Sequence, residues 1–574
     1  MQVSPPNSPP AFSPQETVSR VLLRAYQQTP DTVSVYLLDS RQPDSPITYR
    51  NLFEKSLAFA LRLEQAGIQP GEVVIIILPL SADLICAFFG AILAGAIPSI
   101  MPFLTEKLSP DQYRSSLSAL FEITRPAATI TYPEFLEEVV RARGTQRLPR
   151  EIIVADEVPT LLDTDPHRLP GLLADPDDIV LLQHSSGTTG LQKGVALSHR
   201  SVFNQLNSYG RAIRITSEDV IVSWLPLYHD MGLIAGFLMP ILMRVPLVLM
   251  SPFDWVRAPA RLLRAISDHR GTLCWLPNFA YNFCAQKIRD RDLEGVDLSS
   301  WRVIINCSEP MHWSSHQMFL ERFSPNGLRP QALATSYAMA ENVFAVTQGG
   351  ITSPVVVENI DLRAFFDNQH AELSKDVNHS IKMVSAGQPI ANTSLKVVDS
   401  NGKLLTDRQI GEIAIRSDCL LTGYYNRPDL TEKAFIDGWY QTGDLGYLAN
   451  GELFVTGRKK DLIIVGGKNI YPQDLERLAS DVEGVHPGRV VAFGVFNEAA
   501  GTEEVVIVAE VDDLQPDIRQ AIADKLRQHI TRNSDIALRY AHIVERGWLL
   551  KTSSGKIARA ANRDKFNADI KPTA

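Results

Sequence analysis

SSGTTGLQKG, at residues 185–194, follows directly after the short apolar run Ile179–Leu182. A bounded apolar run of this kind is typical of a buried strand. The glycines and small hydroxyl side chains let backbone N–H groups approach phosphate oxygens, and Lys193 supplies a positive charge. The spacing is not that of a Walker loop, because Lys193 does not follow the second glycine directly. We expect a strand and then a phosphate-binding loop, with a solvated Gly/Ser turn as the alternative. Its binding residues would be Ser185, Ser186, Gly187, Thr188, Thr189, Gly190 and Lys193.

Short apolar runs alternate with helix-like segments on both sides of this loop. Helical patterns begin near Ser81 and recur at Ala258–His269 and Ser314–Phe323. Strands buried on both faces and separated by helices imply parallel sheets with right-handed crossovers. The sequence therefore predicts an α/β fold with a large N-terminal domain of parallel sheets flanked by helices. The remaining strand candidates there are Val73–Leu78, Ile152–Ala155, Val220–Val222, Leu247–Leu249 and Val303–Ile305.

The pattern changes after about Leu395. Short strand-like runs are separated by Asn401-Gly402 and Asn450-Gly451, and Asn-Gly is a strong hairpin signal. The polar segment Gly457–Asp461 then precedes a compact α+β stretch, whose helices are expected at Tyr471–Ala479 and Gln515–Arg532. We expect a Pro-rich tail at 1–14, an N-terminal domain at 15–457 with a β-rich subdomain at 395–457, a hinge at 458–461 and a small C-terminal domain at 462–574.

Composition excludes several classes of protein. The chain has 574 residues, 45% of them hydrophobic, and this is ample material for a core. A net charge of −9 argues against broad binding of nucleic acid or anionic membranes. Five scattered cysteines, never arranged as CxxC, disfavour a zinc site or a disulfide framework and favour a reducing, cytoplasmic compartment.

Neither a secretory signal nor a membrane span is expected. The start, Met1–Pro6, lacks a basic region and an apolar stretch. Leu84–Ile100 is too short to span a bilayer, and its glycines and proline suit a packed core helix. Leu233–Met250 is interrupted by Pro240, Arg244 and Pro246, so we interpret it as buried core as well.

Residues 334–341 read ATSYAMAE and form a second candidate motif. A carboxylate at Glu341 could hold Mg²⁺, which prefers a few hard oxygen ligands together with phosphates. Tyr337 offers a flat face on which a purine could stack. The alternatives are a core tyrosine and a surface or capping glutamate.

Two further motifs carry charge. In Trp439–Gly446 the Asp444 carboxylate can accept two hydrogen bonds from a ribose diol, and Arg458 could brace the same site. In Lys551–Ile557 a lysine on a loop of small residues could move over a phosphate as a mobile point charge. The alternative for Gly443-Asp444 is a simple turn, and the alternative for Lys551–Ile557 is a basic tail.

These four motifs occur in one order and, with WLPLYHD at Trp224–Asp230, closely resemble the adenylate-forming (ANL) superfamily from about Val18 to Phe566. Within it the chain looks most like the fatty acyl-AMP ligases, on the evidence of WLPLYHDMG at 224–232, NIYPQDLE at 469–476 and an extra segment at about Pro354–Met383. The sequence departs from the pattern in the HSSGTTGLQKG loop, in Ala338 where a glycine is usual, and in Ser308 where alanine or glycine is usual.

The resemblance implies a fold, cofactors and residue roles. A carboxylate would attack the α-phosphate of ATP with Mg²⁺ present, and the small C-terminal domain would move between half-reactions about a hinge at Lys460. Lys556, Glu341 and His229 would be the catalytic residues, with Glu341 and Thr188 on the metal. Ser308, Glu309, Pro310, Tyr337 and Ala338 would frame adenine, and Asp444 and Arg458 would fix the ribose. The acyl pocket would be lined by Trp224, Tyr228, His229, Met231, Gly232 and Phe279.

In that family an insertion near Pro354–Met383 hampers a second step with CoA, and the acyl group passes to the phosphopantetheine arm of an acyl carrier protein. A carrier protein, of a polyketide or nonribosomal peptide synthase for instance, is therefore the expected partner. One alternative is an acyl-CoA ligase in which this segment is only a longer loop. Another is a non-catalytic scaffold that binds adenylate or lipid. A monomer is expected to suffice.

Overall fold

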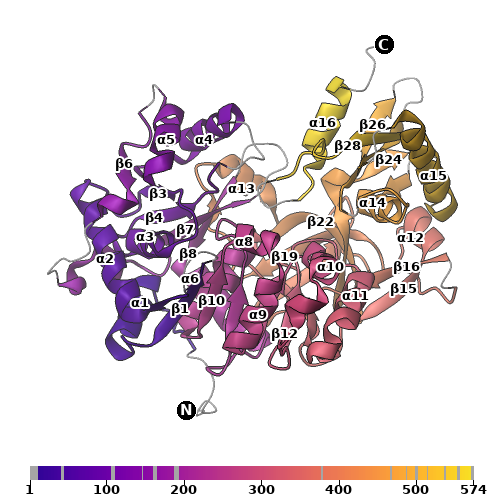
Figure 1. The fold of residues 1–574 in the computed structure, drawn as a ribbon. Coiled ribbons are helices and arrows are strands. Elements are labelled where there is room, and N and C mark those ends of the chain that lie inside the picture. Colours follow the sequence, from indigo (N-terminus) through magenta and orange to yellow (C-terminus); the bar gives the residue numbers. More distant parts are fainter. Residues whose placement is uncertain are drawn as a thin grey trace.

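The computed structural model describes residues 11–39, 44–104, 110–144, 147–158, 165–185, 193–376, 379–465, 468–486, 488–497, 502–512, 515–534, 538–552 and 556–569. Figure 1 shows a large body of helices and sheets, with the C-terminal elements gathered at its upper right. Among the described residues no helix has the length and apolar character needed to cross a bilayer.

A seven-stranded sheet forms the centre of the large body, in the order β13-β12-β11-β9-β10-β1-β2. Its neighbours are parallel except for β1 and β2, which are antiparallel. The expected strands at 220–222, 247–249 and 303–305 are confirmed. The seven strands are β1 (Val33–Leu38), β2 (Ser45–Thr48), β9 (Ile221–Ser223), β10 (Leu247–Met250), β11 (Leu273–Leu276), β12 (Val303–Asn306) and β13 (Leu333–Thr335).

A second, four-stranded sheet is parallel throughout, in the order β4-β3-β5-β6. It consists of β3 (Val73–Ile76), β4 (Ile97–Ile100), β5 (Ala128–Thr131) and β6 (Glu151–Val154). The interpretation of Leu84–Ile100 as one core helix is wrong. Helix α3 (Ala82–Leu93) is capped by Ser81 and ends before Gly95, which has φ +75°, and β4 follows as an edge strand where Pro98 is tolerated.

The helices that pack on these sheets have apolar faces that match their burial. Helices α2 and α3 cross closely, because a Cβ on Gly90 would lie 2.5 Å from the Cβ of Phe59. The run Met231–Leu238 is a buried π-helix that continues into α7. The helices of this body are α1 (Val18–Gln28), α2 (Tyr49–Gln65), α4 (Pro110–Thr124), α5 (Leu136–Arg143), α6 (His199–Ala212), α7 (Met239–Met243), α8 (Pro252–Arg257), α9 (Ala260–His269), α10 (Asn278–Lys287), α11 (Trp313–Phe323) and α13 (Pro428–Ala434).

The strand before the SSGTTGLQKG segment is not part of a parallel sheet, contrary to the expectation for Ile179–Leu182. β7 (Ile179–Ser185) pairs with β8 (Lys193–Ser198) as an antiparallel hairpin, and β20 (Gly423–Tyr424) joins β8 on its other side. The connection between β7 and β8 is too short for the helix that a parallel crossover needs.

The β-rich part is a five-stranded antiparallel sheet, with β18-β19-β22-β21 in order and β23 also on β22. Asn450-Gly451 forms the expected two-residue turn, since Ala449 pairs with Glu452. Asn401-Gly402 lies in a turn closed by the hydrogen bond from the Gly402 N–H to the Asp399 carbonyl, within the longer connection from β18 to β19. The strands are β18 (Thr393–Val398), β19 (Gly411–Ser417), β21 (Phe435–Ile436), β22 (Trp439–Ala449) and β23 (Glu452–Arg458).

The C-terminal part has its own hydrophobic cores. Residues between Ile463 and Ala541 form one buried cluster, and Val491 to Phe566 another. Its sheet has the order β26-β27-β28, and the predicted helices at 471–479 and 515–532 appear as α14 and α15. The elements are β24 (Ile463–Val465), β25 (Lys468–Ile470), α14 (Pro472–Ser480), β26 (Val490–Asn497), β27 (Thr502–Val511), α15 (Pro516–Ser534), β28 (Tyr540–Glu545) and α16 (Arg559–Asp569).

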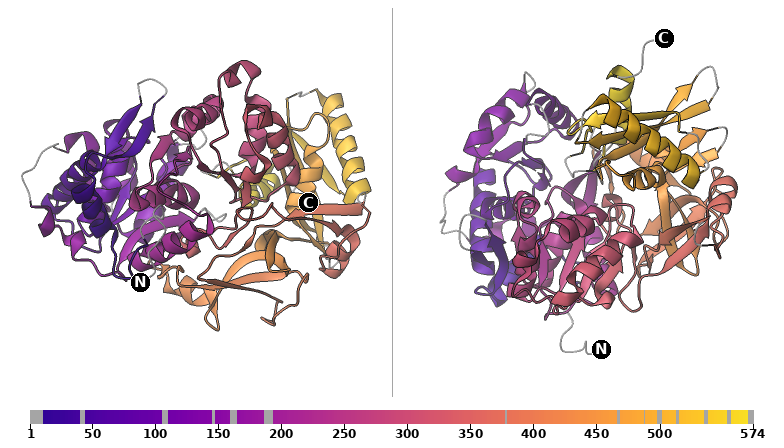
Figure 2. Two further views of the ribbon diagram at one scale, coloured as in Figure 1. Left: turned by 90° about the horizontal axis from the view of Figure 1, so that it is seen from below. Right: turned by 45° about the vertical axis from the view of Figure 1, so that its right-hand side comes forward.

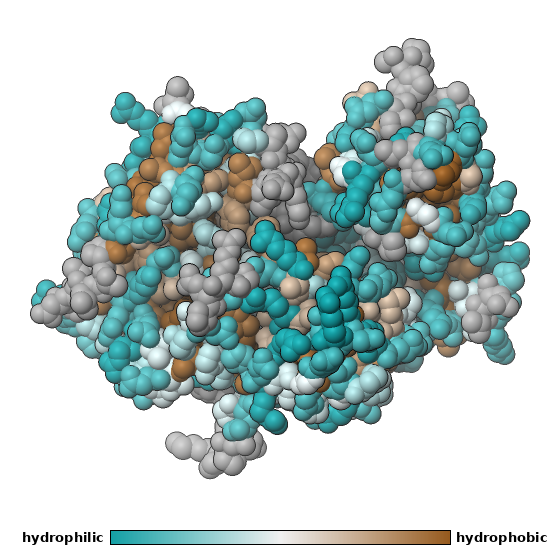
Figure 3. Space-filling model, in the orientation of Figure 1, coloured by the Kyte–Doolittle hydropathy of each residue, from teal (hydrophilic) through white to brown (hydrophobic). Residues whose placement is uncertain are grey.

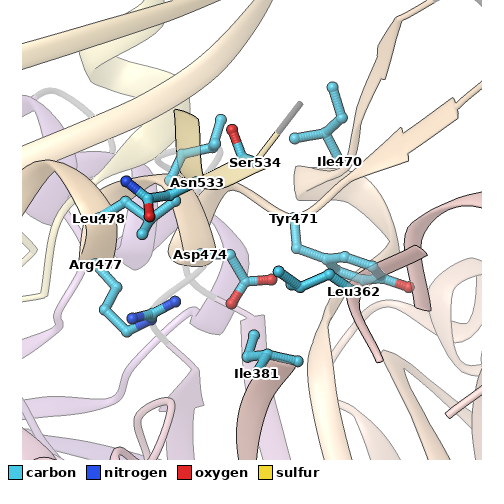
Figure 4. Close-up of a pocket in the computed structure, with 10 residues that line it drawn as sticks. Leu362, Ile381, Ile470, Tyr471, Asp474, Arg477, Leu478, Asn533 and Ser534 are labelled. Carbon is cyan, nitrogen blue, oxygen red and sulfur yellow. The ribbon is translucent and has the colours of Figure 1, made fainter. Parts of the chain in front are cut away.

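The extra segment near Pro354–Met383 folds as β15 (Val357–Asp361), α12 (Leu362–Asn368) and β16 (Ser380–Val384). It lies against the C-terminal part in both views of Figure 2. Figure 4 shows Leu362 and Ile381 facing Asp474 of α14 across a small pocket. The rings of Phe365 and Tyr471 lie 5.4 Å apart, so this contact joins the two parts through apolar packing. The face shown in Figure 3 is mostly hydrophilic and is indented between the two parts.

Candidate active site

Asp444 lies on β22, and each of its carboxylate oxygens contacts a side chain from another part of the chain. The Tyr337 hydroxyl donates to Oδ2 at 2.6 Å, and Arg458 Nε lies 3.2 Å from Oδ1. The alternative interpretation of Gly443-Asp444 as a simple turn is wrong, because strand β22 runs through both residues. Asp444 raises the pKa of the Arg458 guanidinium. A carboxylate has about four lone-pair sites, so acceptor capacity remains for a diol.

Tyr337 is both a core residue and a member of this group. Its side chain is 8% exposed and belongs to the main hydrophobic cluster, while its hydroxyl reaches Asp444. Burial raises the pKa of this hydroxyl well above its ordinary value, and Asp444 adds to the rise. The φ angle of Ala338, the next residue, is not positive. The glycine that is usual at this place is therefore not needed for the backbone conformation.

Glu341 stands on a short 3-10 turn, Ala340–Asn342, close to the end of β13. Its carboxylate accepts a hydrogen bond from the Tyr424 hydroxyl at 3.0 Å. Burial raises the pKa of Glu341, and the nearby Asp230 and Asp444 raise it further. A region with this excess of acidic groups favours a cation.

No group of three or more His, Cys, Asp or Glu side chains in the described ranges is placed to hold a metal ion. A magnesium ion at Glu341 would therefore draw most of its oxygen ligands from phosphates and water. Mg²⁺ in nucleotide sites is bound in this way, through one or two carboxylates and the substrate. The donor set at Glu341 fits such an ion.

The base of the phosphate loop is described, but its tip is not. Ser186, Gly187, Thr188, Thr189 and Gly190 lie outside the described residues, as does the side chain of Ser185. The backbone of Ser185 pairs with Lys193 at the loop end of the β7–β8 hairpin. The Lys193 ammonium lies 4.7 Å from the centre of the Tyr424 ring, which places this cation near Glu341.

The adenine-loop candidates follow the carboxyl end of β12, beside the end of β13. Ser308 has φ +68°, in the left-handed region that favours glycine, so serine is strained there. Glu309 accepts a hydrogen bond from the Phe279 backbone N–H at 3.1 Å. Pro310 leads from this loop toward α11. Parallel neighbours end at the same edge of a sheet, so Ser308–Pro310 and Tyr337 come together.

Lys556 reaches this region from the other end of the chain. Burial raises the pKa values of Asp230 and Glu309, and the Lys556 charge opposes both rises. Its loop is closed by a hydrogen bond from the Thr552 N–H to the Lys556 carbonyl at 2.7 Å. The C-terminal segment and the nucleotide-site residues are thus neighbours in one chain.

His229 lies between Tyr228 and Asp230, at the start of the π-helix. Burial, together with the nearby Lys556 charge, lowers the pKa of its imidazole to about 3, so the ring is neutral at physiological pH. The rings of Tyr228 and His229 lie 5.0 Å apart. Its Nε2 is buried and has no hydrogen-bond partner among the residues that the structure describes.

Two of the acyl-pocket candidates, Trp224 and Phe279, lie beside Trp255, which the sequence did not reveal. Trp224 stacks on Trp255 of α8 at 3.6 Å, and Phe279 lies 6.2 Å from Trp224. Phe279 is 40% exposed, whereas Met231 and Gly232 are buried, and a Cβ on Gly232 would lie 2.2 Å from the Pro226 carbonyl oxygen. Tyr424 and Trp255 follow no spacing or motif that marks them, so only the fold identifies them.

The hinge candidate Lys460 sits on a 3-10 turn, Lys459–Asp461, directly after β23. Burial lowers the pKa of Lys460, and Arg458 lowers it further. Lys459 pairs with Glu412 at 2.8 Å and Asp461 with Arg559 at 2.6 Å, so both neighbours of Lys460 are held by ion pairs.

The whole chain is similar to known fatty-acid ligases. The family model described as AMP-binding enzyme matches residues 22–425. The medium-chain-fatty-acid–[acyl-carrier-protein] ligase JamA of Moorena producens is 31% identical, over 97% of this chain and 96% of the relative. The long-chain-fatty-acid–AMP ligase FadD26 of Mycobacterium tuberculosis is 29% identical, over 95% and 96%.

Solved structures agree. One from a study of fatty acyl-adenylate ligases of E. coli and L. pneumophila matches with a TM-score of 0.88 and 28% identity, over 96% of this chain and 98% of that one. The McyG A-PCP structure with phenylalanyl-adenylate matches with a TM-score of 0.84 and 26% identity, over 98% and 85%. The α/β architecture, the motif order and these similarities lead to one conclusion: the chain belongs to the AMP-binding, adenylate-forming enzyme family and is a fatty acid-AMP ligase.

Proposed function

We propose that this ligase joins a fatty acid to AMP through the residues described above, with Mg²⁺ bound, and then passes the acyl group to a carrier protein. The observation that carries the proposal is the position of Lys556, whose charge acts on Asp230, Glu309 and His229. A cation delivered there from the C-terminal part is what the chemistry requires.

In the first step a carboxylate oxygen attacks the α-phosphorus of ATP. The new bond joins that oxygen to phosphorus, the bond from the α-phosphorus to the bridging oxygen breaks, and pyrophosphate leaves. An anion must approach a polyanion, so catalysis consists of positioning and of positive charge at the phosphoryl oxygens. No protein nucleophile is needed.

The residue roles follow from this requirement. Lys556 neutralises the substrate carboxylate and the α-phosphate as they meet. Asp444 accepts hydrogen bonds from the ribose hydroxyls while Tyr337 and Arg458 keep its carboxylate in place. The SSGTTGLQKG loop cradles the β- and γ-phosphates, Ser308–Pro310 and Ala338 border the adenine, and Trp224, Tyr228, His229, Met231, Gly232 and Phe279 guide the acyl chain.

Glu341 would hold Mg²⁺, with Thr188 as a second ligand from the loop. When bound, the ion would supply positive charge to the triphosphate oxygens. The single carboxylate at Glu341, surrounded by further acidic groups, supports this assignment.

Lys556→Ala tests the first step. We expect pyrophosphate exchange to fall by about 10²–10³-fold, the usual loss for one stabilising group at a developing charge, with ATP binding retained. Lys551→Ala is the matched control, since that ammonium lies on the same loop and donates to the Gly488 carbonyl. Near-normal exchange in Lys556→Ala would remove the assigned role, and the absence of exchange in the unmodified chain would favour a non-catalytic scaffold.

The acceptor of the second step is proposed to be a phosphopantetheine thiol on a carrier protein. JamA carries such an acceptor in its name, and the packing of α12 and β16 on the C-terminal part joins the two parts that must separate for domain rotation. Incubation with ATP, Mg²⁺ and a fatty acid, with and without CoA or a loaded carrier protein, separates the possibilities. Rapid formation of acyl-CoA would refute the carrier protein as the acceptor and favour free CoA.

A monomer suffices for this chemistry, because Lys556 and the nucleotide-site residues come from one chain. Five buried, unpaired cysteines suit a reducing, cytoplasmic compartment. The hinge at Lys460 and the boundary at 458–461 belong to the same proposal, and sedimentation with and without an acyl-adenylate would test both oligomeric state and domain movement.

A further inference from the structure

Tyr424 contacts two charged groups that come from different parts of the sequence. Its hydroxyl donates to Glu341 Oε1 at 3.0 Å, and its ring lies 4.7 Å below the Lys193 ammonium. Lys193 begins β8, and Glu341 stands on the turn after β13. No motif in the sequence includes Tyr424, and no role follows from its neighbours Gly423 and Tyr425.

The proton on Tyr424 has a defined direction. An ionised Glu341 only accepts hydrogen bonds, so the single Tyr424 proton points to it. The Tyr440 hydroxyl, 2.8 Å from the Tyr424 oxygen, must then be the donor in that second bond. The two hydroxyls form a chain that ends on Oε1 of Glu341 and orients its other oxygen. Bonds arranged in such a chain strengthen one another.

The Tyr424 ring is itself held in place. Its N–H donates to the Thr431 hydroxyl at 2.9 Å, and its strand pairs with β8, where Tyr424 lies opposite Val195. Tyr424 is 6% exposed, and its hydroxyl contacts both Glu341 and Tyr440, so burial and these two hydrogen bonds keep the ring beside Lys193. A cation over the face of a tyrosine is stabilised by the ring quadrupole.

We propose that Tyr424 is a positioning residue that holds the Glu341 carboxylate and the Lys193 ammonium at a fixed separation, so that the metal ion and the triphosphate bind together. This rests on the proposed function, since it takes Glu341 as a ligand of Mg²⁺. Residues that orient a metal ligand by hydrogen bonding commonly change metal affinity by 10–100-fold when they are replaced.

Three variants separate the two contacts. Tyr424→Phe removes the hydroxyl and keeps the ring, Tyr424→Leu removes both, and Tyr440→Phe removes only the hydroxyl behind Tyr424. Glu341→Gln is the reference for loss of the ligand itself. The measurement is Mn²⁺ binding in the presence of a non-hydrolysable ATP analogue, followed by electron paramagnetic resonance. The Mg²⁺ dependence of pyrophosphate exchange and the thermal unfolding midpoint are recorded beside it.

We expect Tyr424→Phe to weaken Mn²⁺ binding about tenfold, with an equal rise in the Mg²⁺ concentration needed for exchange. Tyr440→Phe should have a smaller effect, because the direct bond to Glu341 remains. Tyr424→Leu should in addition raise the KM for pyrophosphate, since Lys193 loses the ring. Tyr424→Phe and Tyr424→Leu should weaken metal binding equally, because both lack the hydroxyl. The KM for pyrophosphate should be closer to normal in Tyr424→Phe, because that variant keeps the ring.

Normal Mn²⁺ binding in Tyr424→Phe, with weakened binding in Glu341→Gln, would overturn the role of Tyr424 and leave Glu341 as the ligand. Normal binding in Glu341→Gln would instead remove Glu341 from the metal site and thus refute that part of the proposed function. A lower unfolding midpoint for Tyr424→Phe without any change in metal binding would show a structural role only, and would also overturn the inference.

Discussion

Replacing Arg559 with methionine should loosen the C-terminal part where it meets the 3-10 turn Lys459–Asp461. Arg559 stands at the start of α16, three residues after Lys556. Its guanidinium pairs with Asp461 of that turn at 2.6 Å and with both oxygens of Glu476 on α14 at 2.8 and 3.0 Å. Its Nε also donates to the Ala492 carbonyl at 3.0 Å. One side chain thus joins the Lys459–Asp461 turn, α14, β26 and α16.

The magnitude follows from burial. The side chains of Arg559, Asp461 and Glu476 are exposed by 17%, 17% and 18%. Removing one member of a buried ion group leaves its partners uncompensated and typically costs about 3–5 kcal/mol. Glu476 keeps one further donor, the Ala492 N–H at 2.9 Å, so the lower half of that range is expected. Methionine preserves most of the volume, which keeps the loss electrostatic.

Native-state hydrogen exchange on β26 and α14 measures this directly, because it reports the free energy of local opening. The matched control is Arg527→Met, which breaks a pair with Asp524 whose side chains are 38% and 54% exposed. Such a surface pair should change opening by no more than about 0.5 kcal/mol. If the amides of β26 were equally protected from exchange in the two variants, the buried ion group would not stabilise this part. The Lys556 loop should also become more mobile in Arg559→Met, with slower adenylation.

Three more outcomes are expected. Asp444→Asn should raise the KM for ATP, because Arg458 and the Tyr337 hydroxyl lose an anionic partner and the ribose loses an acceptor; an unchanged KM would exclude Asp444 from the nucleotide site. Gly387→Ala should lower the free energy of unfolding by about 4 kcal/mol or more, since φ is +93° and a Cβ would lie 2.1 Å from the Gly349 nitrogen. Gly402→Ala, where φ is +80° and the space around a Cβ is open, should lower it by only about 1 kcal/mol. Equal losses of stability for the two variants in urea unfolding would contradict the clash at Gly387. Each of the five histidines below should contribute a fall of about 1.4 kcal/mol per pH unit in the free energy of unfolding as the pH drops from 6.5 toward 4, because its folded pKa lies below the unfolded value and it takes up a proton only in the unfolded chain. Buried carboxyls with raised pKa values, such as Asp474, contribute in the opposite direction. The check is therefore the difference in pH slope between the unmodified chain and His184→Gln, and equal slopes between pH 6.5 and 5 would refute the histidine contribution. The histidines are His184, His199, His312 and His316, with pKa values lowered by burial to about 4, and His229, lowered to about 3.

Local patterns predicted most elements of the fold. The apolar runs at Val73–Leu78 and Val303–Ile305 are strands, and the Asn450-Gly451 turn closes a hairpin. They succeeded because strand burial and turn conformation depend on adjacent residues. The two failures, at Leu84–Ile100 and at the strand before the SSGTTGLQKG loop, concern what a segment pairs with. Apolar character alone does not distinguish a helix from a buried strand, or a parallel partner from an antiparallel one.

Part of the candidate site was also predictable. Glu341, Asp444, Arg458 and Lys556 stand in motifs whose order resembles that of one superfamily, and the fold brings Asp444 to Arg458 and Lys556 to the region of Asp230. The roles of Tyr424, Trp255 and Arg559 were not predictable. Each acts on residues far away in the sequence, and nothing in its own neighbourhood signals the contact.

The sequence by itself determined the chemical groups this ligase has available: a loop rich in glycine, serine and threonine, the carboxylates of Glu341 and Asp444, and Lys556 near the end. It did so because those groups are properties of single residues and of short spacings. Only the tertiary structure decided which groups meet, since the Tyr424–Glu341 hydrogen bond and the Arg559 ion pairs depend on sheet pairing and on the packing of separate parts. Such contacts arise from the whole arrangement of strands and helices, and no local stretch of sequence contains them.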